Sequence, residues 1–143
     1  MTVKQISISL ENVPGKLLAV SEFLGLEGIN IRAISVADTS DISTVRFVTD
    51  DPGKTINVLK SHGYSVIETD VLAIEIPDHP GELQTILKPL FLAKINVLYL
   101  YPFLGKSDNN QTIVILGVDK IEESLKILKE NWIRTFGPEI YSF

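Results

Sequence analysis

The residues of this chain that could do chemistry belong to a turn that occurs twice. Asn12-Val13-Pro14-Gly15 recurs 66 residues later as Asp78-His79-Pro80-Gly81. Glycine lets the backbone approach a ligand closely, and a helix that begins after such a turn presents unpaired N–H groups and the positive end of its dipole. These features favour a carboxylate, while Asn12 or Asp78 is placed to accept a hydrogen bond from an ammonium group. Because an α-amino acid carries both groups on one carbon, the turn indicates an amino-acid site.

The alternative interpretation of this turn is structural. Pro-Gly makes a tight turn by itself, and Asn or Asp beside it often bonds to its own backbone. A second polar position also recurs at the same offset, with Asn30 in Ile29-Asn30-Ile31 and Asn96 in Ile95-Asn96-Val97. Each asparagine alone is more typical of a turn than of a ligand contact. The repetition of both positions favours the functional interpretation.

Catalytic and metal-binding motifs are missing from the sequence. It contains no G-x-S-x-G elbow, no phosphate-binding glycine loop and no paired metal-ligand spacing. His62 and His79 are the only histidines, and neither has a partner at i+4. Asp78 beside His79 is the one pair that keeps a small enzyme open as an alternative. We expect no metal and no cofactor.

The overall composition excludes several classes of protein. The chain has 143 residues, 45% hydrophobic and 22% charged, which is typical of an ordered globular protein. The net charge of −5 opposes binding to nucleic acid or to an anionic membrane surface. With no cysteine, the chain has no disulfide and no thiolate chemistry. The N-terminal segment MTVKQISISL is unlike a signal peptide, so we expect a cytoplasmic protein.

The hydrophobic periodicity predicts the same set of elements in each half: strand, helix, strand, strand, helix, strand. In the first half these are a strand at 4–10, a helix after Gly15 that ends at Gly28, strands at 31–36 and 45–49, a helix capped by Asp51-Pro52 and a strand at 64–70. In the second half they are a strand at 72–76, a helix after Gly81, strands at 97–101 and 113–118, a helix that begins at Asp119 and a strand at 133–136. Pro89 is expected to kink or shorten its helix.

The two turns and the later Gly-Ile-Asn-Ile resemble the ACT domain, a ligand-binding module of amino-acid metabolism. The resemblance covers the chain as two units, residues 1–70 and 71–143. It implies an α+β fold with two ferredoxin-like βαββαβ units side by side. Their second strands would join them into one eight-stranded antiparallel sheet with helices on one face.

The resemblance also implies where an effector lies, namely between the strand-to-helix turn of one unit and the second strand of its neighbour. One site would place Asn12, Val13, Gly15, Lys16 and Leu17 opposite Asn96 and Val97. The other would place Asp78, His79, Gly81, Glu82 and Leu83 opposite Asn30 and Ile31. The second turn departs from the first by having Asp78 and His79 in place of Asn12 and Val13.

The function that these expectations favour is a non-catalytic regulatory protein that binds a free amino acid. The first alternative is a regulatory interaction subunit of a biosynthetic enzyme or transcription regulator that has no ligand of its own. A small enzyme that uses Asp78 and His79 is the least favoured. Because both faces of the second half's strands are apolar, we expect a homodimer through its open face. Tyr99 and Tyr101 on one strand could instead stack bases, although the acidic charge argues against nucleic acid.

Overall fold

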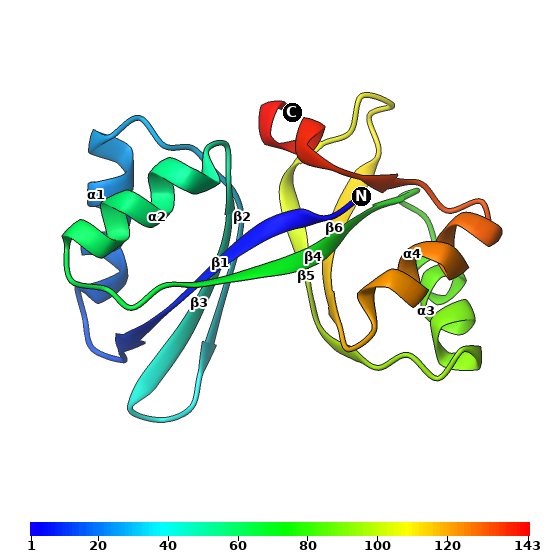
Figure 1. Ribbon diagram of the computed structural model, residues 1–143, viewed down its shortest axis with the longest axis horizontal. Helices are drawn as coiled ribbons and strands as arrows, with labels where there is room; N and C mark the ends of the chain where they lie inside the picture. Colours follow the sequence, from blue (N-terminus) through cyan, green and yellow to red (C-terminus); the bar gives the residue numbers. More distant parts are fainter. The chain divides into compact units, whose positions relative to one another are not determined.

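The computed structural model describes all 143 residues, and Figure 1 shows its elements in order. The first are β1 (Val3–Glu11), α1 (Lys16–Leu26), β2 (Ile31–Asp38), β3 (Ile42–Thr49), α2 (Pro52–Ser61) and β4 (Ile67–Ile76). They are followed by α3 (Glu82–Leu92), β5 (Val97–Lys106), β6 (Thr112–Val118), α4 (Ile121–Glu130), β7 (Thr135–Phe136) and the 3-10 helix η1 (Pro138–Ser142). None of the helices has the length and apolar character needed to cross a membrane.

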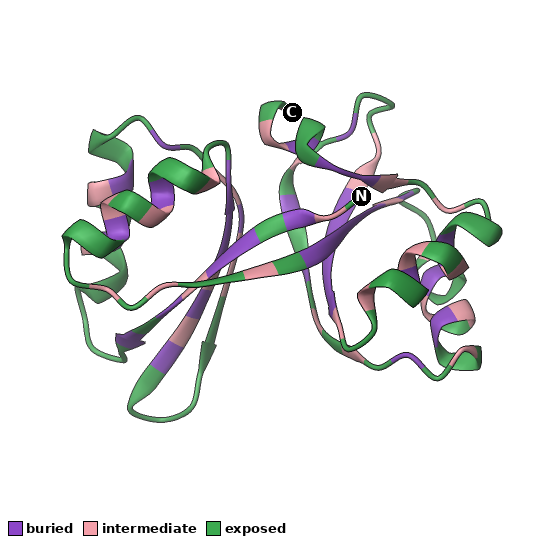
Figure 2. Ribbon diagram, in the orientation of Figure 1, coloured by how far each residue is buried: buried purple, intermediate pink, exposed green.

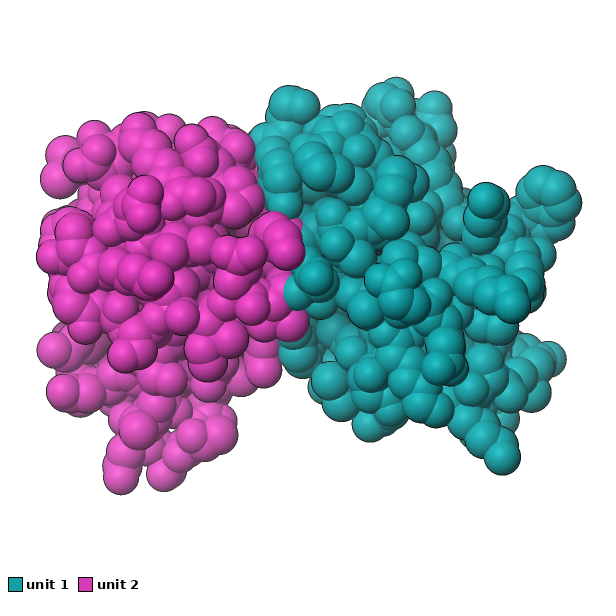
Figure 3. Space-filling view, viewed as in Figure 1, with its two compact units in different colours: residues 1–3, 70–143 teal, residues 4–69 magenta.

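Two compact units make up the chain. The N-terminal unit comprises Lys4–Thr69, and the C-terminal unit comprises Asp70–Phe143 together with Met1–Val3; Figure 3 colours them magenta and teal. Each unit contains antiparallel strands and two helices. The α+β class and the duplication that the sequence predicts are therefore confirmed.

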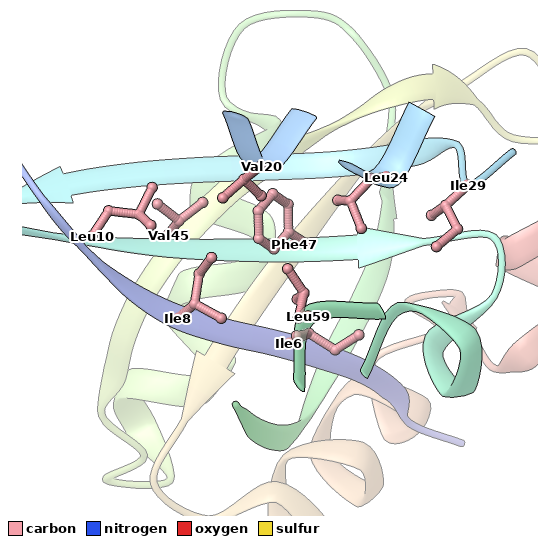
Figure 4. Close-up of a cluster of buried hydrophobic side chains, with 9 residues drawn as sticks. All are labelled: Ile6, Ile8, Leu10, Val20, Leu24, Ile29, Val45, Phe47 and Leu59. Atoms are coloured by element: carbon pink, nitrogen blue, oxygen red, sulfur yellow. The ribbon is translucent and has the colours of Figure 1, made fainter. Parts of the chain in front are cut away.

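In the N-terminal unit, β3 lies between β1 and β2 and pairs antiparallel with both. The alternating pattern of β1 and β3 turns one face of this sheet toward α1 and α2, as Figure 4 shows. The buried residues of this core are Ile6, Ile8, Leu10, Val20, Leu24, Ile29, Val45, Phe47 and Leu59. Because Val20 and Leu24 are fully buried, they hold α1 against the sheet and thereby fix the turn that joins β1 to α1.

The C-terminal unit repeats this arrangement with β6 between β4 and β5. Its core combines β4 and β6 with one face of α3 and α4, and its buried residues are Leu72, Ile74, Ile76, Ile86, Leu90, Ile95, Val114, Leu116 and Leu128. On the opposite face of the strands, Tyr99 pairs with Gly117 and its ring lies across that glycine. A Cβ atom at Gly117 would be 2.2 Å from the Tyr99 ring, so this position has no room for a side chain.

The number of strands differs from the prediction. The two strands expected at 64–70 and 72–76 are one continuous strand, β4, because no turn residue interrupts Ile67–Ile76. The last expected strand, at 133–136, is reduced to the two residues of β7, which pair with Ala73 and Ile74 before Gly137-Pro138 ends the strand. The chain therefore has seven strands rather than eight.

Pro89 does not shorten its helix, which was one of the two effects expected of it. Helix α3 contains eleven residues, the same number as α1, so the proline does not shorten it. Pro89 lies in the last turn of the helix, and the N–H of Ala93 still donates to its carbonyl at 3.2 Å. The helix therefore loses only the hydrogen bond that Pro89 cannot donate.

The sequence predicts self-association through the apolar second face of the C-terminal sheet. In the structure of the single chain, this face is largely buried. A β-bulge between Val97 and Tyr99 changes the alternation of β5, so that Val97 packs against the helical core and Tyr99 lies on the other face. Tyr101 is 4% exposed, and Ile113 and Ile115 are fully buried. Figure 2 shows β6 buried along most of its length. The apolar second face therefore does not by itself indicate a homodimer.

Candidate functional site

The turn before α1 is tied to the hairpin between β2 and β3. The backbone N–H of Asn12 donates to the carbonyl of Asp41 at 2.8 Å, and the Asn12 Nδ2 donates to the carbonyl of Ser40 at 3.0 Å. The donor side of the Asn12 amide is thus used to fix the turn. Its Oδ1 has no protein partner and can accept a hydrogen bond from a ligand.

Helix α1 begins directly after Gly15, which adopts a left-handed conformation with φ of 90°. A Cβ atom there would meet nothing within 4 Å, so the backbone conformation, rather than space, favours glycine. No side chain caps the helix, and its first turn contains Lys16 and no acidic residue. The first N–H groups of α1 have no partner within the helix, and Lys16 adds positive charge beside them. This end of α1 is suited to hold a carboxylate.

The second turn has the same backbone but different electrostatics. Gly81 has φ of 88° and precedes α3 without a side-chain cap. Here the first helical residue is Glu82, whose N–H donates to the carbonyl of His79 at 3.4 Å and whose carboxylate lies 3.1 Å from His79 Nδ1. Asp78 is exposed, and its side chain forms no hydrogen bond or ion pair. Because Glu82 places a negative charge where α1 has Lys16, the start of α3 suits a carboxylate ligand less well.

The two asparagines that open the second strand of each unit are held through their backbones. Asn30 N–H donates to Asp50 Oδ1 at 2.9 Å and Asp50 N–H returns a bond to the Asn30 carbonyl at 3.0 Å. Asn96 and Asp119 repeat this pair at 2.9 and 3.2 Å. Both asparagine side chains are left exposed at the surface. These residues therefore have a structural role whether or not they also contact a ligand.

The helix expected to begin at Asp119 begins at Ile121, whereas Asp51 caps α2 as expected. Asp51 accepts from the N–H of Lys54 at 3.0 Å, but the residue that precedes α4 is Lys120, which makes no such bond. Asp119 corresponds in its contacts to Asp50, a residue that the sequence analysis did not single out. The spacing explains the error, because Asn30 and Asp50 are 20 positions apart and Asn96 and Asp119 are 23 apart.

Within the N-terminal unit, the turn and the start of β2 lie at opposite ends of the sheet. Glu11, at the end of β1, pairs with Ile42 at the start of β3, whereas Ile31 pairs with Thr49 at the end of β3. Seven residues of extended strand separate these two levels, which is roughly 23 Å at about 3.3 Å per residue. The structure of one unit therefore does not bring Asn12 and Asn30 together.

Apolar side chains beside each turn are left partly accessible. Val13 is 48% exposed, Leu17 is 40% exposed and Leu83 is 44% exposed, whereas Ile31 and Val97 pack against the cores of their units. Exposed apolar side chains beside a polar turn can contact the side chain of a bound molecule.

A small cavity of about 230 Å³ adjoins the start of α3, where Glu82 lines it together with Glu75 and Arg134. Arg134 Nη1 and Nη2 bind the two carboxylate oxygens of Asp108 at 2.6 and 3.0 Å, and Nη1 is 3.2 Å from Glu75 Oε2. The hydrogen bonds from Arg134 hold the pKa of Asp108 below its ordinary value. Sequence reasoning missed this ion pair because the partners lie 26 and 59 positions from Arg134 and share no motif.

Comparison with known proteins identifies the fold. A family model described as an ACT domain pair matches residues 1–136. A crystal structure of a protein from Bacteroides thetaiotaomicron is 32% identical, with a TM-score of 0.91, covering 100% of this chain and 98% of that one. A search of curated proteins finds no match.

More distant structures share the fold at low identity. The ligand-free regulatory subunit of aspartate kinase from Thermus thermophilus is 15% identical, with a TM-score of 0.64, covering 90% of this chain and 91% of that one. The corresponding subunit from Thermus flavus is 16% identical, with a TM-score of 0.61, covering 90% of this chain and 92% of that one.

Proposed function

The chain belongs to the ACT domain pair family, and from this premise we propose that it is a non-catalytic regulatory protein of the cytoplasm that binds a free amino acid. The two ACT domains would be residues 1–70 and 71–143. The observation that carries the proposal is the uncapped start of α1 at Gly15, with an unused amide oxygen on Asn12 three residues before it.

The chemistry of this turn matches the two charged groups of an amino acid. The carboxylate would accept from the first N–H groups of α1, where the helix dipole and Lys16 favour an anion. The ammonium group would donate to Asn12 Oδ1. Val13 and Leu17 would contact the ligand's side chain, since both are partly exposed beside the turn. Each of these contacts uses a group that the fold leaves without another partner.

The second turn is proposed as a weaker site. Asp78, Gly81 and Leu83 supply an acceptor, a helix start and an apolar contact, but the Glu82 carboxylate repels the ligand's acid group. His79 is paired with Glu82 at 3.1 Å and would add a polar contact. A ligand with a positively charged side chain would suit this turn better than a neutral one.

The remaining predicted contacts come from a neighbouring ACT unit. Asn30 and Ile31, and likewise Asn96 and Val97, open the second strands and are too distant from the turn of their own unit to share its ligand. We keep them as predicted contacts for the turn of another unit. A homodimer also stays a prediction.

A second candidate function is a regulatory interaction subunit that acts on an enzyme or transcription regulator without a ligand. The aspartate kinase regulatory subunits with this fold favour it, because they act as subunits of an enzyme. It would be recognised by capture of the same partner with and without added amino acids. A small enzyme is less favoured, because Asp78 makes no contact with His79 that could form a catalytic pair.

Titration calorimetry with each of the twenty amino acids tests the main proposal, using the whole chain and two substitutions at one residue. Asn12→Ala removes both the bond to Ser40 and the oxygen proposed for the ligand. Asn12→Asp removes the same donor but keeps an acceptor. We expect binding to be lost in Asn12→Ala and retained in Asn12→Asp. Equal binding by both variants, or no heat with any amino acid, would contradict the proposal.

A further inference from the structure

A groove with a volume of about 660 Å³ lies between α3 and α4 of the C-terminal unit. That volume is within the range of roughly 300–1,000 Å³ that is typical of small-molecule sites. The residues that matter for its chemistry are Lys88, Pro89, Leu92, Ala93, Ile127 and Asn131. Neither predicted turn lies among the residues that line it, so the groove has no part in the proposed amino-acid site.

The N-terminal unit shows what would close such a groove. Phe23 is the counterpart of Pro89, 66 positions earlier, and His62 ends α2 just as Asn131 ends α4. The Phe23 and His62 rings stack with centroids 3.8 Å apart and planes at 17°. This stack bridges α1 and α2, whereas Pro89 and Asn131 have no aromatic ring and cannot form such a stack. The groove is therefore open in one unit and closed by an aromatic pair in the other.

The lining of the groove has an apolar base and a single positive charge. Pro89, Leu92, Ala93 and Ile127 supply carbon surface, and Leu92 is 68% exposed. No acidic side chain lines the groove, although the chain as a whole has a net charge of −5. Lys88 forms no ion pair, and its counterpart in the N-terminal unit is Glu22. The unit with the open groove therefore has a positive charge at Lys88, whereas the other unit has a negative charge at the equivalent Glu22.

We propose that the groove between α3 and α4 binds a small monocarboxylate with an apolar body. The apolar body lies on Pro89, Leu92 and Ile127, where it covers exposed carbon surface. The carboxylate pairs with the ammonium group of Lys88, which has no competing anion in the groove. A neutral molecule of the same shape lacks this pairing and binds more weakly.

Octanoate is the probe that tests this site, with octanol as the neutral molecule of matching chain length. Titration calorimetry is expected to detect octanoate binding to the whole chain and weaker binding of octanol. Lys88→Glu, which installs the N-terminal unit's residue, should weaken octanoate binding about fivefold or more. Glu22→Lys is the matched control, because it makes the opposite change where the aromatic pair closes the groove, and it should leave binding unchanged.

The double substitution Pro89→Phe with Asn131→His places the aromatic pair of the N-terminal unit in the C-terminal unit. The same fold already accommodates this pair in the N-terminal unit, as Phe23 and His62. It should abolish octanoate binding, while Asn12→Ala should not affect it. Amide NMR shifts at Ala93 and Asn131, without shifts at Glu27 and His62, would locate the probe in the groove. Absence of octanoate binding, undiminished binding by the double variant, or equally tight binding of octanol would overturn the proposal.

Discussion

The side-chain Nδ2 of Asn12 donates a 3.0 Å hydrogen bond to the backbone carbonyl of Ser40. This bond joins the turn before α1 to the hairpin between β2 and β3. We expect Asn12→Ala to lower the free energy of unfolding by about 1 kcal/mol, a typical net value for one hydrogen bond. Urea denaturation measures the change, and Asn109→Ala, which removes an exposed amide from the other hairpin, is the control. An unchanged stability in Asn12→Ala would show that the bond does not hold the turn.

Two glycines should respond to alanine for different physical reasons. At Gly15, φ is 90° but no atom obstructs a Cβ, so Gly15→Ala should cost about 1 kcal/mol of backbone strain. At Gly117, a Cβ would be 2.2 Å from the Tyr99 ring, so Gly117→Ala must displace that ring. Thermal unfolding should show the larger loss for Gly117→Ala, together with a changed near-UV signal from tyrosine. A loss no greater than that of Gly15→Ala would contradict the close contact.

Trp132 should be replaceable by glycine with a gain in stability. Four residues that directly follow the C-caps of helices have a left-handed conformation: Gly28 and Gly63 in the N-terminal unit, and Lys94 and Trp132 in the C-terminal unit. Trp132 has φ of 60° and is 95% exposed, so it strains the backbone without packing against the fold. We expect Trp132→Gly to raise the free energy of unfolding by up to about 1 kcal/mol. Trp132→Ala is the control, because it removes the indole but keeps the strain and should give a smaller gain.

The ion pair between Arg134 and Asp108 predicts a dependence on pH. The hydrogen bonds from Arg134 lower the pKa of Asp108 from its ordinary value of 3.8. Because the pKa is lower in the folded chain, the pair contributes stability above about pH 3.8 and loses it as the pH falls through the lowered value. NMR titration of the Asp108 carboxyl carbon should show its pKa rising in Arg134→Gln. Arg46→Gln, which makes the same change of charge in the other unit, should leave this pKa where it is.

Much of the fold follows from local signals in the sequence. Alternating apolar residues predict β1, and the two Pro-Gly turns locate the starts of α1 and α3, because left-handed backbone at Gly15 and Gly81 has a strong residue preference. The same local signals fail where an insertion changes the spacing. The longer hairpin of the C-terminal unit moved Asp119 out of step with Asp50, so the start of α4 was expected at Asp119 rather than at Ile121.

Features that depend on distant partners could not be predicted. The burial of Tyr101 and Ile113 depends on what covers the second face of their strands, and neighbouring residues do not determine that. The Phe23 and His62 stack joins α1 to the end of α2, and these two residues lie far apart in the sequence and share no motif. For the candidate site, the sequence identified the residues of the turn. It could not show that the Asn12 donor is used by Ser40 while its oxygen is unused.

We propose that a free amino acid binds at the turn that contains Asn12 and Gly15. Amide NMR spectra of the labelled chain, recorded before and after addition of an equimolar mixture of the twenty amino acids, test it most directly. We expect shifts centred on Gly15, Lys16 and Leu17 that disappear in Asn12→Ala and persist in Asn12→Asp. Unchanged spectra, or shifts that leave this turn unaffected, would contradict it.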